Sequence, residues 1–294
     1  MIQHASVTRS LFNICNLIFL IALSLLCILP VIQVIAVSFS SSSAAAAGLV
    51  KLWPVEFSLK SYEFILKKKD FLGSFLISIQ RVILGTGISM FLTVTLGYAL
   101  SKEAKDFRMR TFYAWYFVIT ILFSGGLIPW YLTIKYTHLM DTIWALVIPG
   151  AVTVFNVILL LNFFRGLPKE LEESSFMDGG SHWITLWKIY LPLSMPAIAT
   201  VSLFTIVGHW NSWFDGLMLV NSPSDYPLAT YLQTAIIQQD FANMRAEDVK
   251  TLSEISDRTT RAAQIFIGAL PIMAVYPFLQ KYFMTGLVMG SVKE

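Results

Sequence analysis

The sequence predicts an all-α, polytopic membrane protein with six transmembrane helices. Of its 294 residues, 56% are hydrophobic and 13% are charged, whereas a soluble domain carries about 25% charged residues. A bilayer span needs about 20 mostly apolar residues. Six blocks reach this length, at about 11–38, 71–100, 111–133, 142–164, 195–220 and 263–289. A soluble protein with a very apolar core is the alternative, and blocks of this length disfavour it.

The first block is expected to be a retained membrane anchor. Arg9 precedes it and the small residues of 41–48 follow it, so a cleaved signal peptide is the alternative. However, the apolar core of a signal peptide has about 7–15 residues, and the stretch 11–39 is much longer. Cys15 and Cys27 lie about 18 Å apart along this helix, too far for a disulfide within the chain. No redox role is therefore expected for them.

Glycine and proline inside the later blocks remain compatible with membrane helices. Neighbouring helices can satisfy the backbone groups that such residues set free. The residues concerned are Gly85, Gly87, Pro129, Pro149, Pro271 and Pro277. We therefore keep each of the six blocks as one continuous span.

Two outer segments, 39–70 and 221–262, connect spans in this interpretation. Residues 59–66 have the amphipathic pattern of a short helix lying at the membrane surface, and 246–260 are expected to be helical. No appended soluble domain is recognisable, so we expect one membrane domain over residues 1–294.

The segment 165–194 is polar and broken by glycine. Pro168 fits the first turn of a helix, and the acidic residues after it lie near the positive end of that helix. Gly179 and Gly180 stop the helix, and Ser181 can cap the next one. An aromatic stripe repeats on one face of this second helix: Trp183, Trp187 and Tyr190. We expect two short helices joined by a tight turn, a shape that another protein can grip.

This segment resembles the EAA loop of bacterial ABC importer permeases, the cytoplasmic element that docks on a separate ATPase. The positions that match its spacing are Glu173, Gly179, Ile189, Leu191 and Pro192, with Ser174 and Ser175 replacing the two alanines. The likeness extends from about residue 60 to 294. Further motifs resemble those of carbohydrate importers, at 210–214, 226–228 and 281–293. The chain most resembles the second permease subunit of oligosaccharide importers, such as those for maltose, lactose, alginate or pectin-derived fragments.

The resemblance implies a type I ABC importer permease fold and a passive role in catalysis. It implies a homologous second permease, two ATPase subunits, an external solute-binding protein and an oligosaccharide substrate, with lipid around the spans and no nucleic acid. The residues expected to couple to the ATPase are Glu172, Glu173, Ser174, Ser175, Asp178 and Gly179. The chain has no Gly-x-x-x-x-Gly-Lys-Ser/Thr phosphate loop. We therefore expect no enzyme activity and no cofactor in this chain, with ATP and Mg²⁺ bound by the partner ATPase.

The orientation of the chain in the membrane is inferred from the resemblance. An even number of spans places both termini on one side, and the EAA-like loop implies the cytoplasmic side of the bacterial inner membrane. Basic residues divide equally between the two predicted sides, so the positive-inside rule does not decide. The outer basic residues fit lipid headgroups or an acidic partner, including an acidic, uronate-containing sugar.

Polar residues inside spans are costly and commonly face a cavity or a partner. The candidates for a substrate path are Arg81, Asn156, His209, Trp210, Asn211, Trp213 and Asp215. Aromatic faces suit sugar rings, and an arginine suits a sugar carboxylate. Structural alternatives stay open: an interfacial aromatic belt for the tryptophans, interhelical hydrogen bonding for Asn156, and for Arg81 an ion pair with Asp215 or snorkelling.

Three other functions remain as alternatives. An importer permease for phosphate, amino acids or metals would share the EAA-like loop. A membrane-embedded enzyme, such as a glycosyltransferase or a protease, is disfavoured because the sequence has no His-Glu-x-x-His motif, no Gly-x-Ser-x-Gly motif and no outward pair of carboxylates at a characteristic spacing. An ion-driven secondary transporter should show internal repeats and broken helices near the midplane of the membrane, and neither is discernible in the sequence.

Overall fold

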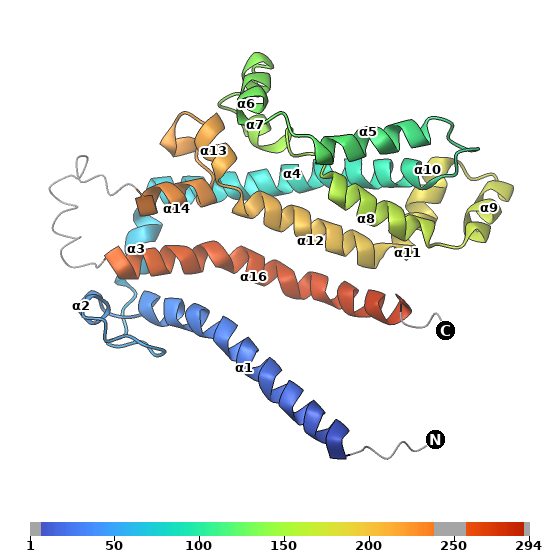
Figure 1. The fold of residues 1–294 in the computed structure, drawn as a ribbon. Helices are drawn as coiled ribbons and strands as arrows, with labels where there is room; N and C mark the ends of the chain where they lie inside the picture. The colour runs from blue at the N-terminus through green and yellow to red at the C-terminus, as the bar shows by residue number, and fades with distance from the viewer. Residues whose placement is uncertain (1–6, 238–256, 291–294) are drawn as a thin grey trace. The chain divides into compact units, whose positions relative to one another are not determined.

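The computed structural model describes residues 7–237 and 257–290, and regular structure within them is entirely helical (Figure 1). The predicted all-α class is therefore confirmed. In chain order the helices are α1 (Val7–Ser38), α2 (Ser42–Ala46), α3 (Lys60–Lys67), α4 (Lys69–Ser101), α5 (Arg110–Leu122), α6 (Leu127–Tyr136), α7 (Ile143–Val147), α8 (Val154–Arg165), α9 (Lys169–Met177), α10 (His182–Thr185), the π-helix η1 (Leu186–Tyr190), α11 (Leu191–Leu193), α12 (Met195–Asn211), α13 (Phe214–Leu219), the 3₁₀-helix η2 (Pro223–Asp225), α14 (Leu228–Ile237) and α16 (Asp257–Gly290).

The chain divides into two compact units. The first takes in Met1–Lys69 and Ile236–Ala269, and the second takes in Asp70–Ala235 and Leu270–Glu294, each as far as its residues are described. The expected single membrane domain stays a prediction. Most of the expected helix at 246–260 and the end of the 281–293 motif lie outside the described residues.

The first unit has a small core where α1 ends. Its buried residues are mainly alanine and valine: Ala36, Val37, Ala44, Ala45, Val50 and Ala262. The hydroxyl of Tyr62 donates to Ser38 Oγ at 2.7 Å, and Ser61 Oγ donates to Thr259 Oγ1 at 2.9 Å. These bonds hold α3 in place. The helix α3 itself, Lys60–Lys67, confirms the short helix expected near 59–66. The rest of α1 exposes large apolar side chains along its length, and Cys15 and Cys27 are free and exposed.

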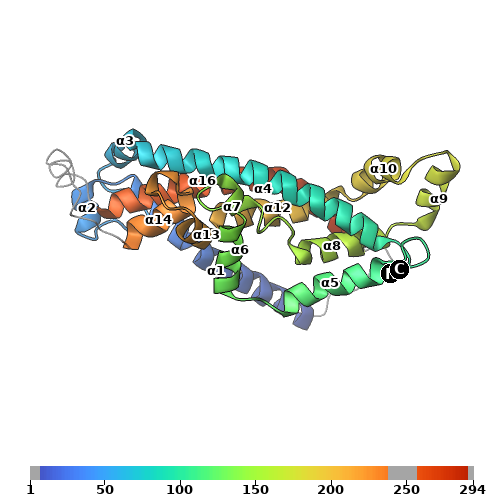
Figure 2. The same ribbon diagram turned by 90° about the horizontal axis from the view of Figure 1, so that it is seen from above.

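The second unit packs α4, α8 and α12 together (Figures 1 and 2). Val94 and Tyr98 of α4 contact Leu160 and Phe164 of α8 and Ala197 of α12.

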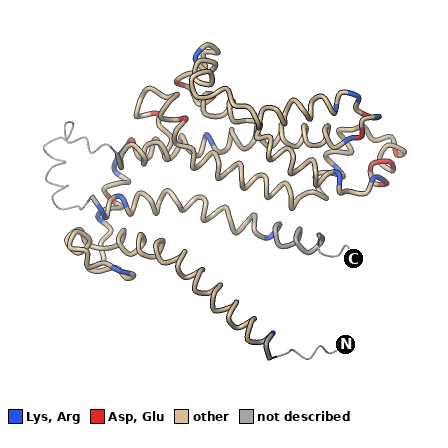
Figure 3. Tube along the Cα trace, in the orientation of Figure 1, with Lys and Arg blue, Asp and Glu red and all other residues tan. Residues whose placement is uncertain are grey.

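A polar contact also joins two of these helices. Asn156 Nδ2 of α8 donates a hydrogen bond to Thr205 Oγ1 of α12 at 3.3 Å. Charged residues gather near the helix ends (Figure 3), and Arg81 of α4 is the one charged residue in the middle of these three helices. This pattern fits helices that cross a membrane.

Three of the six predicted blocks form long, unbroken apolar helices. They cover Leu11–Ser38, Lys69–Ser101 and Arg258–Phe278. Two bent helix pairs can each form one further span. The count of six spans is consistent with this structure but remains a prediction.

The block 111–133 is broken, which corrects the expectation of one continuous span. Helix α5 ends at Leu122 and α6 starts at Leu127, and the two are bent by 118°. Gly126 lies between them with φ of 85°. This left-handed backbone conformation is open to glycine and interrupts the helix.

The blocks 142–164 and 195–220 are also broken. The first contains Pro149 and Gly150 between α7 and α8, and proline cannot continue a helix. Helix α8 has 12 residues, about 18 Å of rise, which is shorter than the hydrocarbon core of about 30 Å. In the second block α12 stops at Asn211 and α13 starts at Phe214. Polar residues at this break bond to other elements instead of extending the helix.

Replacing Leu160 by alanine should destabilise the second unit. Leu160 is fully buried among α4, α8 and α12, and such a truncation costs about 2–5 kcal/mol of unfolding free energy. Thermal unfolding of the detergent-purified protein measures the effect. Leu122→Ala is the matched control, because Leu122 is exposed. Equal melting temperatures for the two variants would contradict this packing.

Candidate functional site

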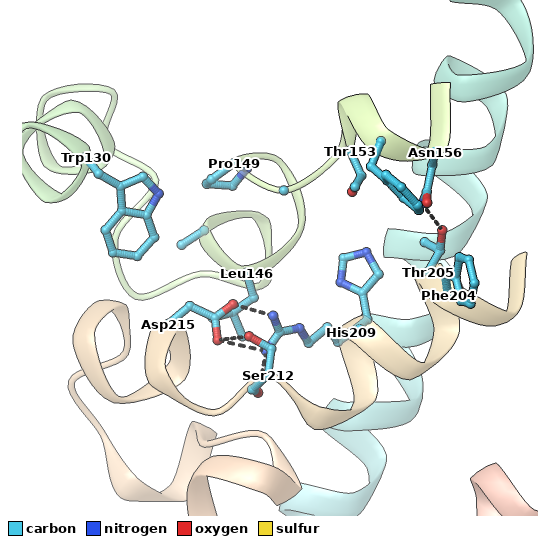
Figure 4. A pocket seen from close by; sticks show the side chains of 15 residues that line it. Trp130, Leu146, Pro149, Thr153, Asn156, Phe204, Thr205, His209, Ser212 and Asp215 are labelled. Carbon is cyan, nitrogen blue, oxygen red and sulfur yellow. Dashed lines mark hydrogen bonds and ion pairs between the residues drawn. The ribbon is translucent and has the colours of Figure 1, made fainter. Parts of the chain in front are cut away.

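The second unit contains a cavity of about 610 Å³ (Figure 4). Its wall combines Arg81 from α4, Leu146 from α7, Asn156 from α8, His209 from α12 and Asp215 from α13. Small-molecule sites commonly have volumes of about 300–1,000 Å³. The helix breaks on either side of α7 and at α12–α13 bring these side chains to one place.

A buried ion pair forms one wall of the cavity. The guanidinium of Arg81 is 2% exposed and bonds the carboxylate of Asp215 through both Nη atoms. Arg81 Nη1 also donates to the Ser212 carbonyl at 3.1 Å. Asp215 Oδ1 accepts from Ser212 Oγ at 2.8 Å and from the Gly216 amide at 2.9 Å. The α12–α13 break is thereby tied to the unbroken helix α4, as the structural alternative for Arg81 anticipated.

The ring of His209 fills a space that α4 leaves at Gly85. A Cβ atom on Gly85 would lie 2.5 Å from Nε2 of His209, so any larger residue at this position would displace the His209 ring. His209 is nearly buried and faces the cavity. Within the described residues, no group of three or more His, Cys, Asp or Glu side chains could hold a metal ion.

The structure separates the seven candidates for the substrate path. Arg81, Asn156, His209 and Asp215 line the cavity. The other three do not: Trp210 is buried against Phe75, Asn211 is exposed, and Trp213 packs edge-on against Phe214. Successive helical residues point about 100° apart, so neighbours of His209 cannot all face the same space.

The sequence-based prediction did not include several residues that line the cavity. Thr205 and Ser212 lie four residues before and three after His209. The i, i+3, i+4 rule for one helix face would have identified them. Trp130 and Phe204 also line the cavity, but no polar signal distinguishes them from packing residues.

The predicted pair of short helices is confirmed, and we call residues 169–193 the elbow. Helix α9 ends at Met177, and Gly179 turns the chain with φ of 80°. Ser181 then caps α10, its Oγ accepting from the Ile184 amide at 3.4 Å. Ser175 holds the two arms together by a 2.8 Å hydrogen bond to Thr185 Oγ1.

The six predicted coupling residues face different ways. Glu173, Ser174, Asp178 and Gly179 are exposed on the elbow. Ser175 is buried between the arms, and Glu172 turns inward to Lys102 and Tyr190. The exposed face also carries large apolar side chains, including Met177, which is 88% exposed. The elbow therefore presents a mixed acidic and apolar surface.

The predicted aromatic stripe on the second arm is corrected by the π-helix. Trp183 and Trp187 are exposed, but Tyr190 is buried. The expected i, i+4, i+7 spacing assumes a regular α-helix. The π turn at η1 widens the helical repeat and rotates Tyr190 away from the two tryptophans.

Replacing Gly180 by alanine should disrupt the elbow. The added Cβ would lie 2.6 Å from Ser175 Oγ and 2.7 Å from the Ser175 carbonyl oxygen, and the carbonyl cannot move without the helix. Gly179→Asn is the control, because nothing lies within 4 Å there and asparagine tolerates the left-handed backbone. Limited proteolysis at the elbow should accelerate for Gly180→Ala alone. Equal cleavage of both variants would contradict the close contact.

Comparison with known proteins identifies the chain. Residues 4–288 match the family described as "Binding-protein-dependent transport system inner membrane component". "Protein LplC" of Bacillus subtilis (strain 168) is 38% identical over 291 residues, covering 99% of this chain and 98% of that protein. The "Polygalacturonan/rhamnogalacturonan transport system permease protein YtcP" of the same organism is 38% identical over 242 residues, covering 82% of this chain and 84% of that protein.

A solved structure gives the same result for the fold. It is entitled "Crystal structure of a bacterial ABC transporter involved in the import of the acidic polysaccharide alginate". One of its chains superimposes with a TM-score of 0.87 and 32% sequence identity, over 95% of this chain and 99% of that one. The resemblance to ABC importer permeases is thus confirmed, and the chain belongs to the family of binding-protein-dependent transport system inner membrane components.

Proposed function

We propose that this chain is a permease subunit of an ABC importer that carries oligosaccharides across the bacterial inner membrane. The observation that carries this proposal is the match along nearly its whole length to sugar-importer permeases. The cavity at Arg81 and His209 supplies a space of suitable volume within the same unit. The relatives' sugar substrates favour this function over the import of phosphate, amino acids or metals.

The substrate is proposed to be acidic. The names of two similar proteins refer to polygalacturonan and to alginate, which are polymers of uronic acids. Arg81 provides a buried guanidinium at the cavity, with an Nε that bonds no atom of the described residues. Asp215 neutralises this charge, and a sugar carboxylate could take over part of its bonding because guanidinium binds carboxylates in a planar fork.

Energy for transport is proposed to come from two partner ATPase subunits, which bind ATP and Mg²⁺ while this chain binds neither. The elbow offers the docking surface, through Glu173, Asp178 and the apolar side chains of Met177 and Trp183. This role places the elbow and both termini in the cytoplasm. ATP binding would close the ATPase pair and move the elbow, and the cavity would open alternately to each side.

Three further partners complete the proposed importer. A homologous second permease would enclose the substrate path together with this chain. An external solute-binding protein would deliver the sugar, in agreement with the binding-protein-dependent family. Lipid would cover the apolar surface of α1.

Changing Glu173 to lysine should uncouple uptake from ATP hydrolysis without preventing membrane insertion. Glu173 is exposed at the first arm of the elbow, so its replacement alters the docking surface and not the core. Transport assays in reconstituted vesicles measure the effect. Met177→Cys should also cross-link to an ATPase subunit. Normal uptake by Glu173→Lys together with no such cross-link would contradict docking.

Acidic specificity can be tested with matched oligosaccharides. The wild type should import a uronate oligosaccharide in preference to its carboxyl-reduced counterpart of equal length. The double variant Arg81→Gln/Asp215→Asn removes both charges and keeps hydrogen-bonding groups of similar shape. Its uronate uptake should be lower than that of the wild type by about tenfold or more, because a hydrogen bond to a charged group contributes a binding free energy of this size. Equal wild-type uptake of both sugars would exclude this specificity.

A further inference from the structure

A buried lysine lies beside the elbow, and no motif distinguishes it from the other basic residues of the chain. Lys102 directly follows the last residue of α4, and its side chain is 8% exposed. Its Nζ lies 2.5 Å from Glu172 Oε1. Nζ also lies over two rings, 3.8 Å from the centroid of Tyr98 and 4.5 Å from that of Tyr190. Aromatic faces attract cations, so the ammonium is held on three sides.

The ion pair and the two tyrosines around it belong to three elements. The second oxygen of Glu172 accepts from Tyr190 Oη at 2.7 Å. The Tyr190 ring packs edge-on against Tyr98 and Phe164, with centroids 5.0 and 5.5 Å away. We call Tyr98, Lys102, Glu172 and Tyr190 the Lys102 joint. It connects the end of α4, helix α9 and the π-helix η1.

A second set of contacts joins α4 and α9 to α10. Tyr98 Oη lies 3.1 Å from Nδ1 of His182 in α10. The His182 ring packs edge-on against Phe176 of α9, with centroids 5.0 Å apart. Both arms of the elbow are therefore attached to Tyr98, one through Lys102 and Glu172 and the other through His182.

Such a buried ion pair is better suited to fixing geometry than to adding stability. Desolvation of the two charges offsets most of their attraction, whereas loss of one partner leaves a buried charge unpaired. Burial, the largest effect, lowers the pKa of Lys102, and Glu172 opposes this shift. The charged lysine thus depends on Glu172 remaining in place.

Helix α4 extends from this joint to the cavity. It is unbroken from Lys69 to Ser101 and carries both Arg81 and Tyr98. These two residues are separated by about 25 Å of helical rise. A continuous helix of this kind moves as a rod, because bending it would break backbone hydrogen bonds that lipid cannot replace.

We propose that the Lys102 joint passes movement of the elbow to α4 and so to the cavity, with Lys102 as a positioning residue. The inference rests on the proposed docking of the elbow on an ATPase. An elbow that was only loosely attached would move under the ATPase without moving the cavity wall.

The chain provides a matched control in a neighbouring ion pair. Lys169 of α9 bonds Glu103 in the segment after α4, so this pair connects nearly the same elements. However, its side chains are 72% and 43% exposed. Exposed pairs contribute little because water screens them, and we expect Lys169 to be dispensable.

The test uses the complete importer with its partner permease, ATPases and binding protein. Lys102→Met should retain the ATPase subunits and basal ATP hydrolysis. It should lose the stimulation of hydrolysis by sugar-loaded binding protein, and uptake should fall by about tenfold or more, as for a broken buried pair. Lys102→Arg, which keeps the charge and the stacking, should restore both. Tyr190→Phe, which removes one bond to Glu172, should give a smaller loss.

Four results would overturn the proposal. They are normal stimulation and uptake by Lys102→Met, loss of its ATPase subunits, failure of Lys102→Arg to restore coupling, and an equal defect in Lys169→Met. Failure of the docking proposal is distinguishable, because it would appear in the wild type as an elbow that forms no cross-link to an ATPase. A wild-type cross-link with normal coupling in Lys102→Met would reject the joint alone.

Discussion

Two buried ion pairs attach broken segments to one continuous helix, and the arrangement of the second unit depends on them. Arg81 within α4 binds Asp215 of α13, and Lys102 directly after α4 binds Glu172 of α9. Broken helices in a membrane leave backbone groups that protein must satisfy. Arg81 does so for the Ser212 carbonyl at the α12–α13 break. The cavity and the elbow are thus both anchored to α4.

These two ion pairs explain how a largely apolar chain can bury charged side chains. Each cation is matched by one carboxylate and by further hydrogen bonds or aromatic faces. Neither group is left as an isolated buried charge, which would be strongly destabilising. The same pairing also gives each end a definite geometry. At the cavity this geometry fixes the guanidinium of Arg81, and at the elbow it holds two short helices against α4.

Length and local backbone chemistry made part of the fold predictable. The unbroken spans followed from long apolar blocks, and the elbow followed from Pro168, Gly179 and Ser181. The breaks at Gly126 and Pro149 were not predicted, because the sequence is apolar on both sides of them and glycine and proline are also tolerated within membrane helices. The burial of Tyr190 depends on a π turn, and the inward turn of Glu172 depends on Lys102, which is 70 residues away in sequence. Such contacts arise from tertiary packing and have no local signal.

We expect the elbow and α4 to move as one body. The most direct measurement is the distance between spin labels at Met177→Cys on the elbow and Phe91→Cys on the exposed face of α4, in a chain whose two native cysteines are replaced. Pulsed electron paramagnetic resonance on the complete importer compares the ATP-trapped state with the ATP-free state. We predict one narrow distance distribution that does not shift, while the distance from Met177 to the partner permease changes. A shift or broadening of the Met177–Phe91 distance on ATP binding would contradict the claim.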